Sequence, residues 1–194
     1  MNSLPNNFLM PTSPQADAVE LVEYGDFACS QCQRVRQLID SILKAFAGRL
    51  TYTFCHFPNH RSDSSILASM AAEAARRQGF FWPMFRALFT QPTINHANLL
   101  ILATYLGMNS NQFNADLADE QVRLHIDADQ QEGYRLGVTK TPTLFVGGQQ
   151  FHGKLTQSRL SSIIHTHLSR SPQPILTKVD LASGTIYWGQ GEWN

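Results

Sequence analysis

The stretch that decides the fold is Val22-Glu23-Tyr24-Gly25-Asp26-Phe27-Ala28-Cys29-Ser30-Gln31-Cys32. It joins a short apolar segment, residues 19–24, to a helical pattern over residues 35–46. The first segment has the length and valine content of a strand. The second places its apolar side chains on one stripe with the 3.6-residue period of a helix, and Gly48 is placed to end it. The stripe consists of Val35, Leu38, Ile39, Ile42, Leu43 and Phe46. The sequence therefore predicts a strand, a Cys-x-x-Cys motif and a helix in immediate succession.

The two cysteines of this motif lie at the start of the predicted helix. Backbone N–H groups are unpaired there and the helix dipole favours negative charge, so we expect the thiolate of Cys29 to be stabilised and nucleophilic near neutral pH. Cys32 follows one turn later, close enough to attack a mixed disulfide formed at Cys29. The spacing predicts an exposed attacking sulfur at Cys29 and a buried resolving sulfur at Cys32.

A second motif, Thr141-Pro142-Thr143, comes directly before the apolar run Leu144-Phe145-Val146. Gly147-Gly148 follows as a tight turn, and residues 149–152 read as the second strand of a β-hairpin. A proline at the entrance of a strand removes a backbone donor, and X–Pro is the peptide bond in which the cis form is most accessible. The hairpin is therefore predicted to begin in an unusual loop.

With these motifs and the strand end Phe54-Cys55-His56-Phe57-Pro58, the chain resembles the thioredoxin-like superfamily and, more narrowly, the DsbA-type thiol oxidoreductases. The resemblance covers about residues 17–168. It implies a cis peptide bond before Pro142 and a loop that faces the cysteines. It also implies that Thr141 and Pro142 bind the backbone of a substrate peptide.

The predicted fold class is α/β: a thioredoxin fold with a helical insertion between the second strand and the cis-proline strand. Residues 17–60 and 137–170 form the predicted thioredoxin-like domain. The inserted helical domain is predicted over 61–136. Residues 1–16 are expected to be a flexible N-terminal arm, and residues 171–194 a C-terminal extension that forms a β-hairpin.

Composition restricts the classes of partner. The chain has 194 residues, enough for one α/β core, and its 15 basic and 15 acidic residues balance. The charge gives no electrostatic case for nucleic acid or an anionic membrane as partner. No apolar run approaches the ~20 residues of a membrane span. Because the first residues do not resemble a signal peptide, we expect a cytoplasmic location, or a periplasmic one if a leader is missing.

Glu23 lies six residues before Cys29, within the predicted first strand. Burial beneath the motif would raise the pKa of this carboxyl and allow it to move the proton of Cys32 during resolution. The resemblance supports this role, because thioredoxin-like enzymes commonly have an acid at the matching place. The alternative is a glutamate that faces solvent, with Glu20 and Asp26 as weaker candidates for the same role.

The remaining cysteine and the nearby histidines are the other potential metal ligands around the motif. A zinc site needs four ligands, and adjacent strand residues such as Cys55 and His56 point to opposite faces, so no metal is predicted. Cys55 is predicted to be a small buried strand residue. His56 and His60 are predicted to be surface residues.

The sequence thus predicts a protein thiol–disulfide oxidoreductase that needs no cofactor, because the electrons reside on the pair Cys29 and Cys32. Its expected partners are protein thiols or disulfides, with glutathione or a thioredoxin-type system as candidates for recycling. One alternative is a glutathione-dependent transferase or isomerase on a related fold; another is a non-catalytic peptide-binding module. The neutral Gln31 beside Cys32 predicts a weaker oxidant than the exported DsbA enzymes.

Overall fold

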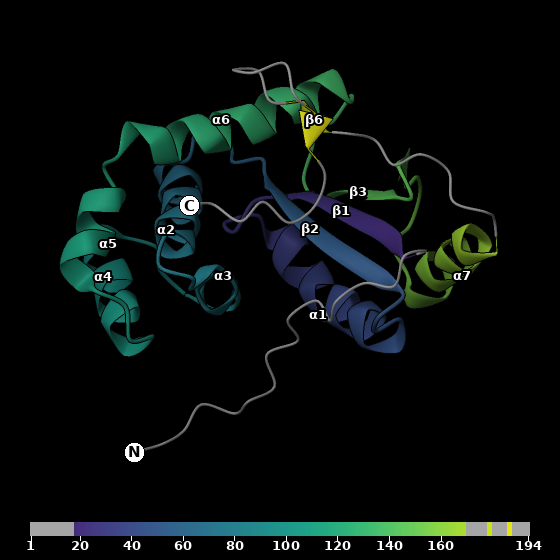
Figure 1. Cartoon of the computed structure of the whole chain (residues 1–194), viewed down its shortest axis with the longest axis horizontal. Helices are drawn as coiled ribbons and strands as arrows, with labels where there is room; N and C mark the ends of the chain where they lie inside the picture. Colours follow the sequence, from purple (N-terminus) through teal and green to yellow (C-terminus); the bar gives the residue numbers. More distant parts are fainter. Residues whose placement is uncertain (1–17, 170–177, 180–185, 188–194) are drawn as a thin grey trace.

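The computed structural model describes residues 18–169, 178–179 and 186–187 (Figure 1). Its elements follow in the order β1 (Val19–Gly25), α1 (Ser30–Ala45), β2 (Leu50–His56), α2 (Asp63–Arg76), α3 (Phe81–Leu88), α4 (His96–Tyr105), α5 (Ser110–Asp116), α6 (Glu120–Arg135), β3 (Thr143–Val146), β4 (Gln149–Gln150) and α7 (Gln157–Leu168). The strand, the motif and the helix therefore succeed one another as predicted.

The main sheet has four strands in the order β2-β1-β3-β4. Strands β1 and β2 are parallel, with Val19 opposite Leu50 and Gly25 opposite His56. Strand β3 runs antiparallel to β1, and β4 antiparallel to β3. Because β1 and β2 are parallel, their carboxyl ends lie at the same edge of the sheet, where α1 begins. This topology confirms the predicted α/β thioredoxin-like fold.

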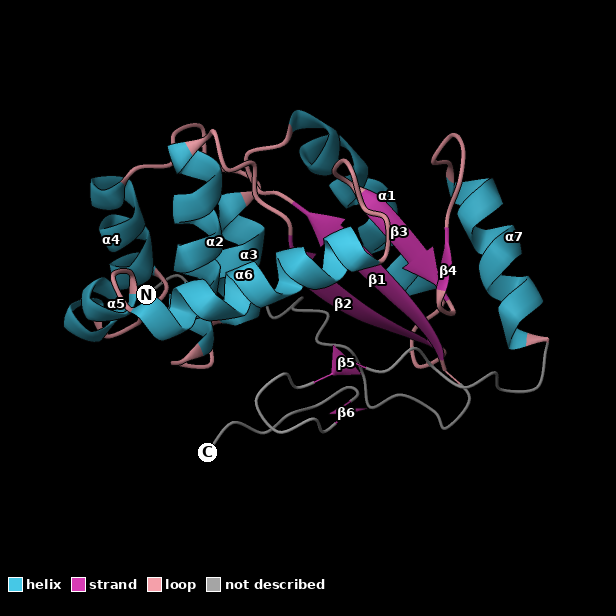
Figure 2. Cartoon of the chain, turned by 90° about the horizontal axis from the view of Figure 1, so that it is seen from above, coloured by secondary structure: helices cyan, strands magenta, loops and turns pink. Residues whose placement is uncertain are grey.

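The two faces of the sheet are covered by different helices, as Figures 1 and 2 show. Leu21 of β1 packs in one cluster with residues of α1 and α7. Tyr24 belongs to a second cluster that includes Cys55 and Val138, on the face crossed by α6. Side chains alternate between the faces of a strand, so Glu23 shares the α1 face with Leu21.

The helical insertion lies between β2 and β3, and helices α2 to α5 stand beside the sheet before α6 returns across it (Figure 2). Polar side chains begin most of these helices: Ser62 accepts a hydrogen bond from the Ser65 N–H, and Asn95, Asn109 and Asp119 do the same at later helices. All five helices fall within residues 61–136, although the domain boundaries remain a prediction.

A group of phenylalanines joins the insertion to the motif. Phe27, fully buried just before Cys29, lies 5.1 Å from Phe54 of β2 and 4.9 Å from Phe89 between ring centroids. Phe85 of α3 lies 4.9 Å from Phe54. These edge and tilted contacts are the arrangements that aromatic pairs prefer. The end of helix α3 is thus packed against the loop that carries the cysteines.

Two glycines allow aromatic rings to lie against β1. A Cβ added to Gly25 would stand 2.3 Å from Cε2 of Phe54. On the other face, a Cβ added to Gly133 of α6 would stand 2.8 Å from Cε2 of Phe57 and 3.0 Å from Cδ1 of Tyr24. Both positions therefore need a residue without a side chain.

The chain ends are described only in part. β5 (Lys178–Val179) and β6 (Ile186–Tyr187) pair antiparallel. The residues between them lie outside the described part, so the C-terminal hairpin remains a prediction. The predicted arm at residues 1–16 also lies outside it.

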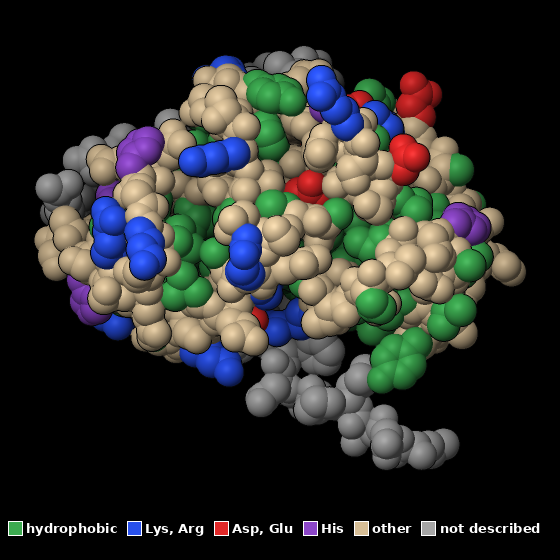
Figure 3. Space-filling view, turned by 180° about the vertical axis from the view of Figure 1, so that it is seen from behind, with side chains coloured by type: hydrophobic (Ala, Val, Ile, Leu, Met, Phe, Trp, Pro, Cys, Tyr) green, Lys and Arg blue, Asp and Glu red, His purple; other side chains and the backbone are tan. Residues whose placement is uncertain are grey.

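Two surface properties of the described residues bear on partners. None of their helices is long and apolar enough to cross a membrane. Figure 3 shows one face of the molecule, on which basic, acidic and apolar side chains are interspersed.

Candidate active site at the start of helix α1

Cys29 is the N-cap residue of α1. Its backbone is extended, and its side chain makes no capping hydrogen bond. The sulfur instead donates to the carbonyl oxygen of Thr141, 3.5 Å away. Cys29 is half-buried, and Cys32 is only 1% exposed. Both are free cysteines, and Cys29 is the more accessible of the two.

Cys32 holds its proton tightly. Burial raises the pKa of this thiol most, and the charges on Glu23 and Cys29 add to the rise, while a hydrogen bond with the backbone of Asp26 opposes it. The Cys32 thiol is therefore protonated at neutral pH and needs a base before it can act as a nucleophile.

The loop before β3 faces the cysteines. The peptide bond between Thr141 and Pro142 is cis, as the resemblance implied. Thr143 closes the turn by donating its hydroxyl to the carbonyl of Lys140 at 2.7 Å. The turn brings the Thr141 carbonyl beside Cys29, so the two predicted motifs meet at one point.

Asp26 fixes the loop between β1 and α1. Its Oδ1 accepts from the Ala28 N–H at 2.9 Å. Its Oδ2 accepts from the Ser65 hydroxyl at 2.9 Å and the Asn59 N–H at 3.2 Å. Because its oxygens already have donors, this carboxylate holds the motif loop to the start of α2 and is poorly suited to carry the proton of Cys32.

Glu23 is buried in β1, with 1% exposure, so the solvent-facing alternative is wrong. The Tyr52 hydroxyl donates to its Oε2 at 2.5 Å. Burial raises the pKa of this carboxyl; the Arg36 charge and the Tyr52 hydrogen bond work against that rise, and the Asp40 charge adds to it. A buried carboxyl with a raised pKa suits proton transfer, and its part in resolution stays a prediction.

Sequence reasoning missed Tyr52 and Arg36. Two signals could have found them. Tyr52 shares one face of β2 with Leu50 and Phe54 by strand alternation, and Arg36 stands one turn after Cys32, on the same side of α1.

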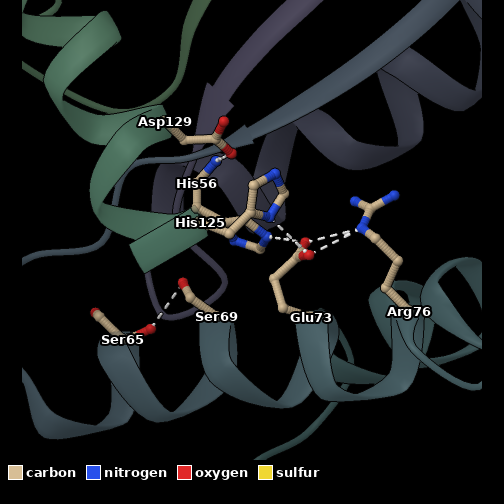
Figure 4. Close-up of polar contacts among 7 residues, drawn as sticks. All are labelled: His56, Ser65, Ser69, Glu73, Arg76, His125 and Asp129. Carbon is tan, nitrogen blue, oxygen red and sulfur yellow. Dashed lines mark hydrogen bonds and ion pairs between the residues drawn. The ribbon is translucent and has the colours of Figure 1, made fainter. Parts of the chain in front are cut away.

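His56 was predicted at the surface, and this is wrong, since its side chain is fully buried. Its Nε2 lies 2.7 Å from Oε1 of Glu73 in α2. Oε2 of Glu73 lies 2.8 Å from Nδ1 of His125 and accepts from Nε of Arg76 at 2.9 Å (Figure 4). Docking of α2 and α6 on the end of β2 covers His56, whereas His60 is exposed as predicted.

We call Glu73, His56, His125 and Arg76 the Glu73 cluster. Burial raises the pKa of Glu73, but hydrogen bonds from His125 and His56 and the charges of His56 and Arg76 outweigh it, leaving the pKa well below its usual range.

Cys55, beside His56, faces the other side of the sheet in the cluster of Tyr24. No group of three or more histidine, cysteine or acidic side chains within the described ranges is arranged to hold a metal ion.

Comparison with protein families matches residues 13–166 to the Thioredoxin_4 model, described as thioredoxin. Similar curated proteins include the Na⁺/H⁺ antiporter NhaA 1 of Mycolicibacterium gilvum, 34% identical over 157 residues, which are 75% of this chain and 25% of the antiporter. The NhaA antiporter of Herminiimonas arsenicoxydans is 30% identical over 170 residues, 83% of this chain and 27% of that protein. The chain thus spans about a quarter of the length of these relatives.

Solved structures share the fold. A thioredoxin-like oxidoreductase from Silicibacter pomeroyi is 25% identical with a TM-score of 0.71, over 79% of this chain and 88% of that one. BdbD from Bacillus subtilis is 23% identical with a TM-score of 0.72, over 82% and 93%. The thiol-disulfide exchange protein α-DsbA2 of Wolbachia pipientis is 20% identical with a TM-score of 0.69, over 82% and 88%.

Proposed function

Because this chain belongs to the Thioredoxin_4 family of DsbA-like thiol–disulfide oxidoreductases, we propose that it exchanges disulfides with protein substrates through Cys29 and Cys32. One observation carries the proposal. The half-buried sulfur of Cys29 stands at the N-cap of α1 and 3.5 Å from the carbonyl of Thr141, one turn before the buried Cys32.

Reduction of a substrate would proceed in two displacements. The Cys29 thiolate attacks one sulfur of the substrate disulfide; a bond forms between them and the other substrate sulfur leaves as a thiolate. Cys32 then gives its proton to Glu23 and attacks the Cys29 sulfur, which releases the second substrate thiolate. The pair ends as a disulfide and the substrate has gained two electrons. The same steps in reverse oxidise a substrate dithiol.

The loop at Thr141 and Pro142 supplies the substrate-binding surface in this proposal. Pro142 has no N–H, whereas Thr141 has both an N–H and a carbonyl that could pair with the backbone of a peptide. That carbonyl already lies beside the Cys29 sulfur. A peptide bound to this backbone would bring its own sulfur to the attacking atom.

Reduction of insulin by dithiothreitol tests the proposal. The wild-type protein is expected to accelerate precipitation of the insulin B chain, and Cys29→Ser to abolish the acceleration. Cys32→Ser should retain the first displacement and accumulate mixed disulfides with insulin, seen on non-reducing gels. A glutathione-dependent transferase would need glutathione and no second cysteine, and a non-catalytic module would show no acceleration at all; either result refutes the proposal.

The redox potential of Cys29 and Cys32 bears on the cellular compartment in which the protein would act. A strong oxidant stabilises its reduced thiolate with positive charge between the cysteines, whereas Ser30 and Gln31 are neutral here. We propose a potential between roughly −270 and −120 mV, nearer the reducing end, which suits a reductase or isomerase in the cytoplasm recycled by glutathione or a thioredoxin-type system. Titration against glutathione gives the value, and one close to −120 mV would favour a periplasmic oxidant instead.

A second candidate function comes from the curated relatives. This chain aligns with a quarter of the length of Na⁺/H⁺ antiporters. In the alternative, it is a redox unit whose substrates are the thiols of a membrane transport protein. Cys32→Ser expressed in cells should trap its substrates as mixed disulfides. Mass spectrometry of the trapped proteins would separate a transporter from soluble substrates.

A further inference from the structure

One oxygen of Glu23 is held by two side chains. The Tyr52 hydroxyl donates to Oε2 at 2.5 Å and accepts from Nη1 of Arg36 at 2.9 Å. Nη1 of Arg36 lies 3.8 Å from the same Oε2. The phenol therefore bridges a guanidinium and a carboxylate, and fixes the position of both.

The other oxygen of Glu23 lies toward the motif. A Cβ built on Gly25 would stand 3.2 Å from Oε1. Gly25 is the last residue of β1 on the face that Glu23 occupies, and the loop to Cys29 follows it. Oε2 is thus directed at β2 and α1, whereas Oε1 lies along the strand in the direction of the cysteines. Cys32 is close enough for the charge of Glu23 to raise its pKa.

Arg36 is well placed to influence this carboxylate. Its guanidinium is largely buried, with 11% side-chain exposure, and lies 5.2 Å from the ring centroids of both Tyr52 and Phe85. Shielding from water strengthens its interaction with Glu23. Its other terminal nitrogen binds Asp40 at 3.0 Å, and that carboxylate is half-exposed.

The charged and titratable groups around Glu23 come from two elements, with aromatic rings from a third. The ionisable groups are Tyr52 of β2 and Cys29, Cys32, Arg36 and Asp40 of α1, and the rings are Trp82 and Phe85 of α3. Only Arg36 carries positive charge in this set.

We propose that Tyr52 and Arg36 are positioning residues for the resolving step: they bind Oε2 of Glu23, favour the ionised form of the carboxylate, and leave Oε1 to accept the proton of Cys32. The inference rests on the proposed function of Cys29 and Cys32. In the step itself, the Cys32 proton passes to Oε1, the Cys32 thiolate attacks the Cys29 sulfur, and the substrate sulfur leaves with the electron pair of the broken bond.

The proposal fixes the sign of three changes. Glu23 accepts a proton only above its own pKa, so the resolving rate falls on the acid side of that value. Arg36→Met removes the neighbouring positive charge, which raises the pKa and should move this acid limb to higher pH by about one unit or more. Tyr52→Phe should move it the same way by less. Asp40→Asn removes a negative charge and should move it to lower pH.

Stopped-flow reaction with an excess of an aromatic disulfide measures the two steps separately. The reduced protein should release one aromatic thiolate when Cys29 attacks and a second when Cys32 resolves, each seen by its absorbance. The rate of each phase is recorded against pH for the wild type and the variants. Below the acid limb, Arg36→Met should slow the second phase about tenfold for each unit of displacement and leave the first unchanged.

The controls separate positioning from a structural role. Arg36→Lys keeps the charge and should bring the acid limb of the resolving rate most of the way back to its wild-type pH. Arg34 is an exposed arginine of the same helix, and Arg34→Met should leave the acid limb at its wild-type pH. An unmoved limb in Arg36→Met overturns the inference, as does a shift of Asp40→Asn in the same direction. If Arg36→Met does not fold, Asp40→Asn decides: a limb at lower pH supports the inference and an unmoved one refutes it. Release of a single thiolate by the wild type would refute the proposed function itself.

Discussion

Two glutamates are buried on the same side of this molecule, and their pKa values are shifted in opposite directions. Glu23 is 1% exposed and Glu73 is 4% exposed, so desolvation penalises both carboxylates. At Glu23 one phenol and one more distant guanidinium do not compensate for it, and the pKa is raised. At Glu73 two imidazoles and Arg76 more than compensate, and the pKa is well below its usual range.

The comparison shows that burial alone does not decide what a buried acid does. The number and kind of partners separate a carboxyl whose pKa is raised, which suits proton transfer, from one whose pKa is lowered and which stays charged and holds helices together. Glu73 joins α2, β2 and α6 through His56 and His125. Glu23 stands beneath the cysteines.

The largest effect is expected for removal of the Glu73 carboxylate. Glu73→Ala leaves the buried His56 without its acceptor and should lower the free energy of unfolding by about 3 kcal/mol. Urea denaturation at neutral pH measures this. The matched control is Glu132→Ala, because Glu132 also pairs with an arginine three residues later, but at the surface; its cost should stay within about 1 kcal/mol. Equal costs would mean that the buried cluster contributes no more than a surface pair.

Glu23→Gln should slow one of the two steps of the reaction. The amide keeps the shape but cannot accept the Cys32 proton, so the resolving step should slow about 100-fold while the initial attack by Cys29 is unchanged. Stopped-flow kinetics separates these steps. Glu20→Gln, in the same strand but on the opposite face, is the control and should alter neither. Equal slowing of both steps by Glu23→Gln would remove the distinction between the two buried acids.

The pH dependence of stability sharpens the comparison further. The lowered pKa of Glu73 means that its contribution is complete above the ordinary value of 4.5 and is lost as pH falls below it. The raised pKa of Glu23 means that ionisation costs stability as pH rises from 4.5 through the folded value. The free energy of unfolding is measured with urea from about pH 3 to 7. As pH rises, Glu73→Gln should become less stable relative to wild type, and Glu23→Gln should become more stable relative to wild type. Parallel trends would contradict the assignment of the two shifts.

The smallest effect is expected on the opposite face of the sheet. Cys55 packs there with Tyr24 and Phe145, away from both carboxylates. Cys55→Ala should cost about 1 kcal/mol of stability and leave insulin reduction nearly unchanged. A folded Cys55→Ala protein without activity would show that this face takes part in the redox chemistry.

Local patterns in the sequence were sufficient for much of the fold, whereas the meeting of the two motifs was predicted from the family resemblance. The apolar period predicted α1, and the Cys-x-x-Cys spacing placed Cys29 at its start. The cis bond at Pro142 came from family resemblance, because no local pattern distinguishes it from a trans bond. In each case the deciding interactions lie within a few residues or within a shared family motif.

Long-range contacts account for the two features that the sequence did not predict, the burial of His56 and the pairing of Arg36 with Tyr52. His56 ends a strand just before Phe57 and Pro58, a pattern typical of the surface, and it is buried because helices α2 and α6 dock on that strand end. Arg36 looks like a solvated helix residue until Tyr52, on a separate strand, supplies its acceptor. Strand and helix periodicity indicates the faces on which Tyr52 and Arg36 lie, but a single sequence carries no record of which distant polar groups will pair.

The glycines on either side of β1 have a consequence for protein engineering. A side chain at residue 25 would overlap the ring of Phe54 on one face of the sheet. A side chain at residue 133 would overlap the ring of Phe57 on the other face. Any library that adds a side chain at one member must shrink its aromatic partner in the same clone, since single substitutions would overlap. The two positions of each pair must therefore be substituted together. A redesign of the redox pair's surroundings should therefore vary residues 25 and 54 together, and leave the pair at 57 and 133 as the independent reference.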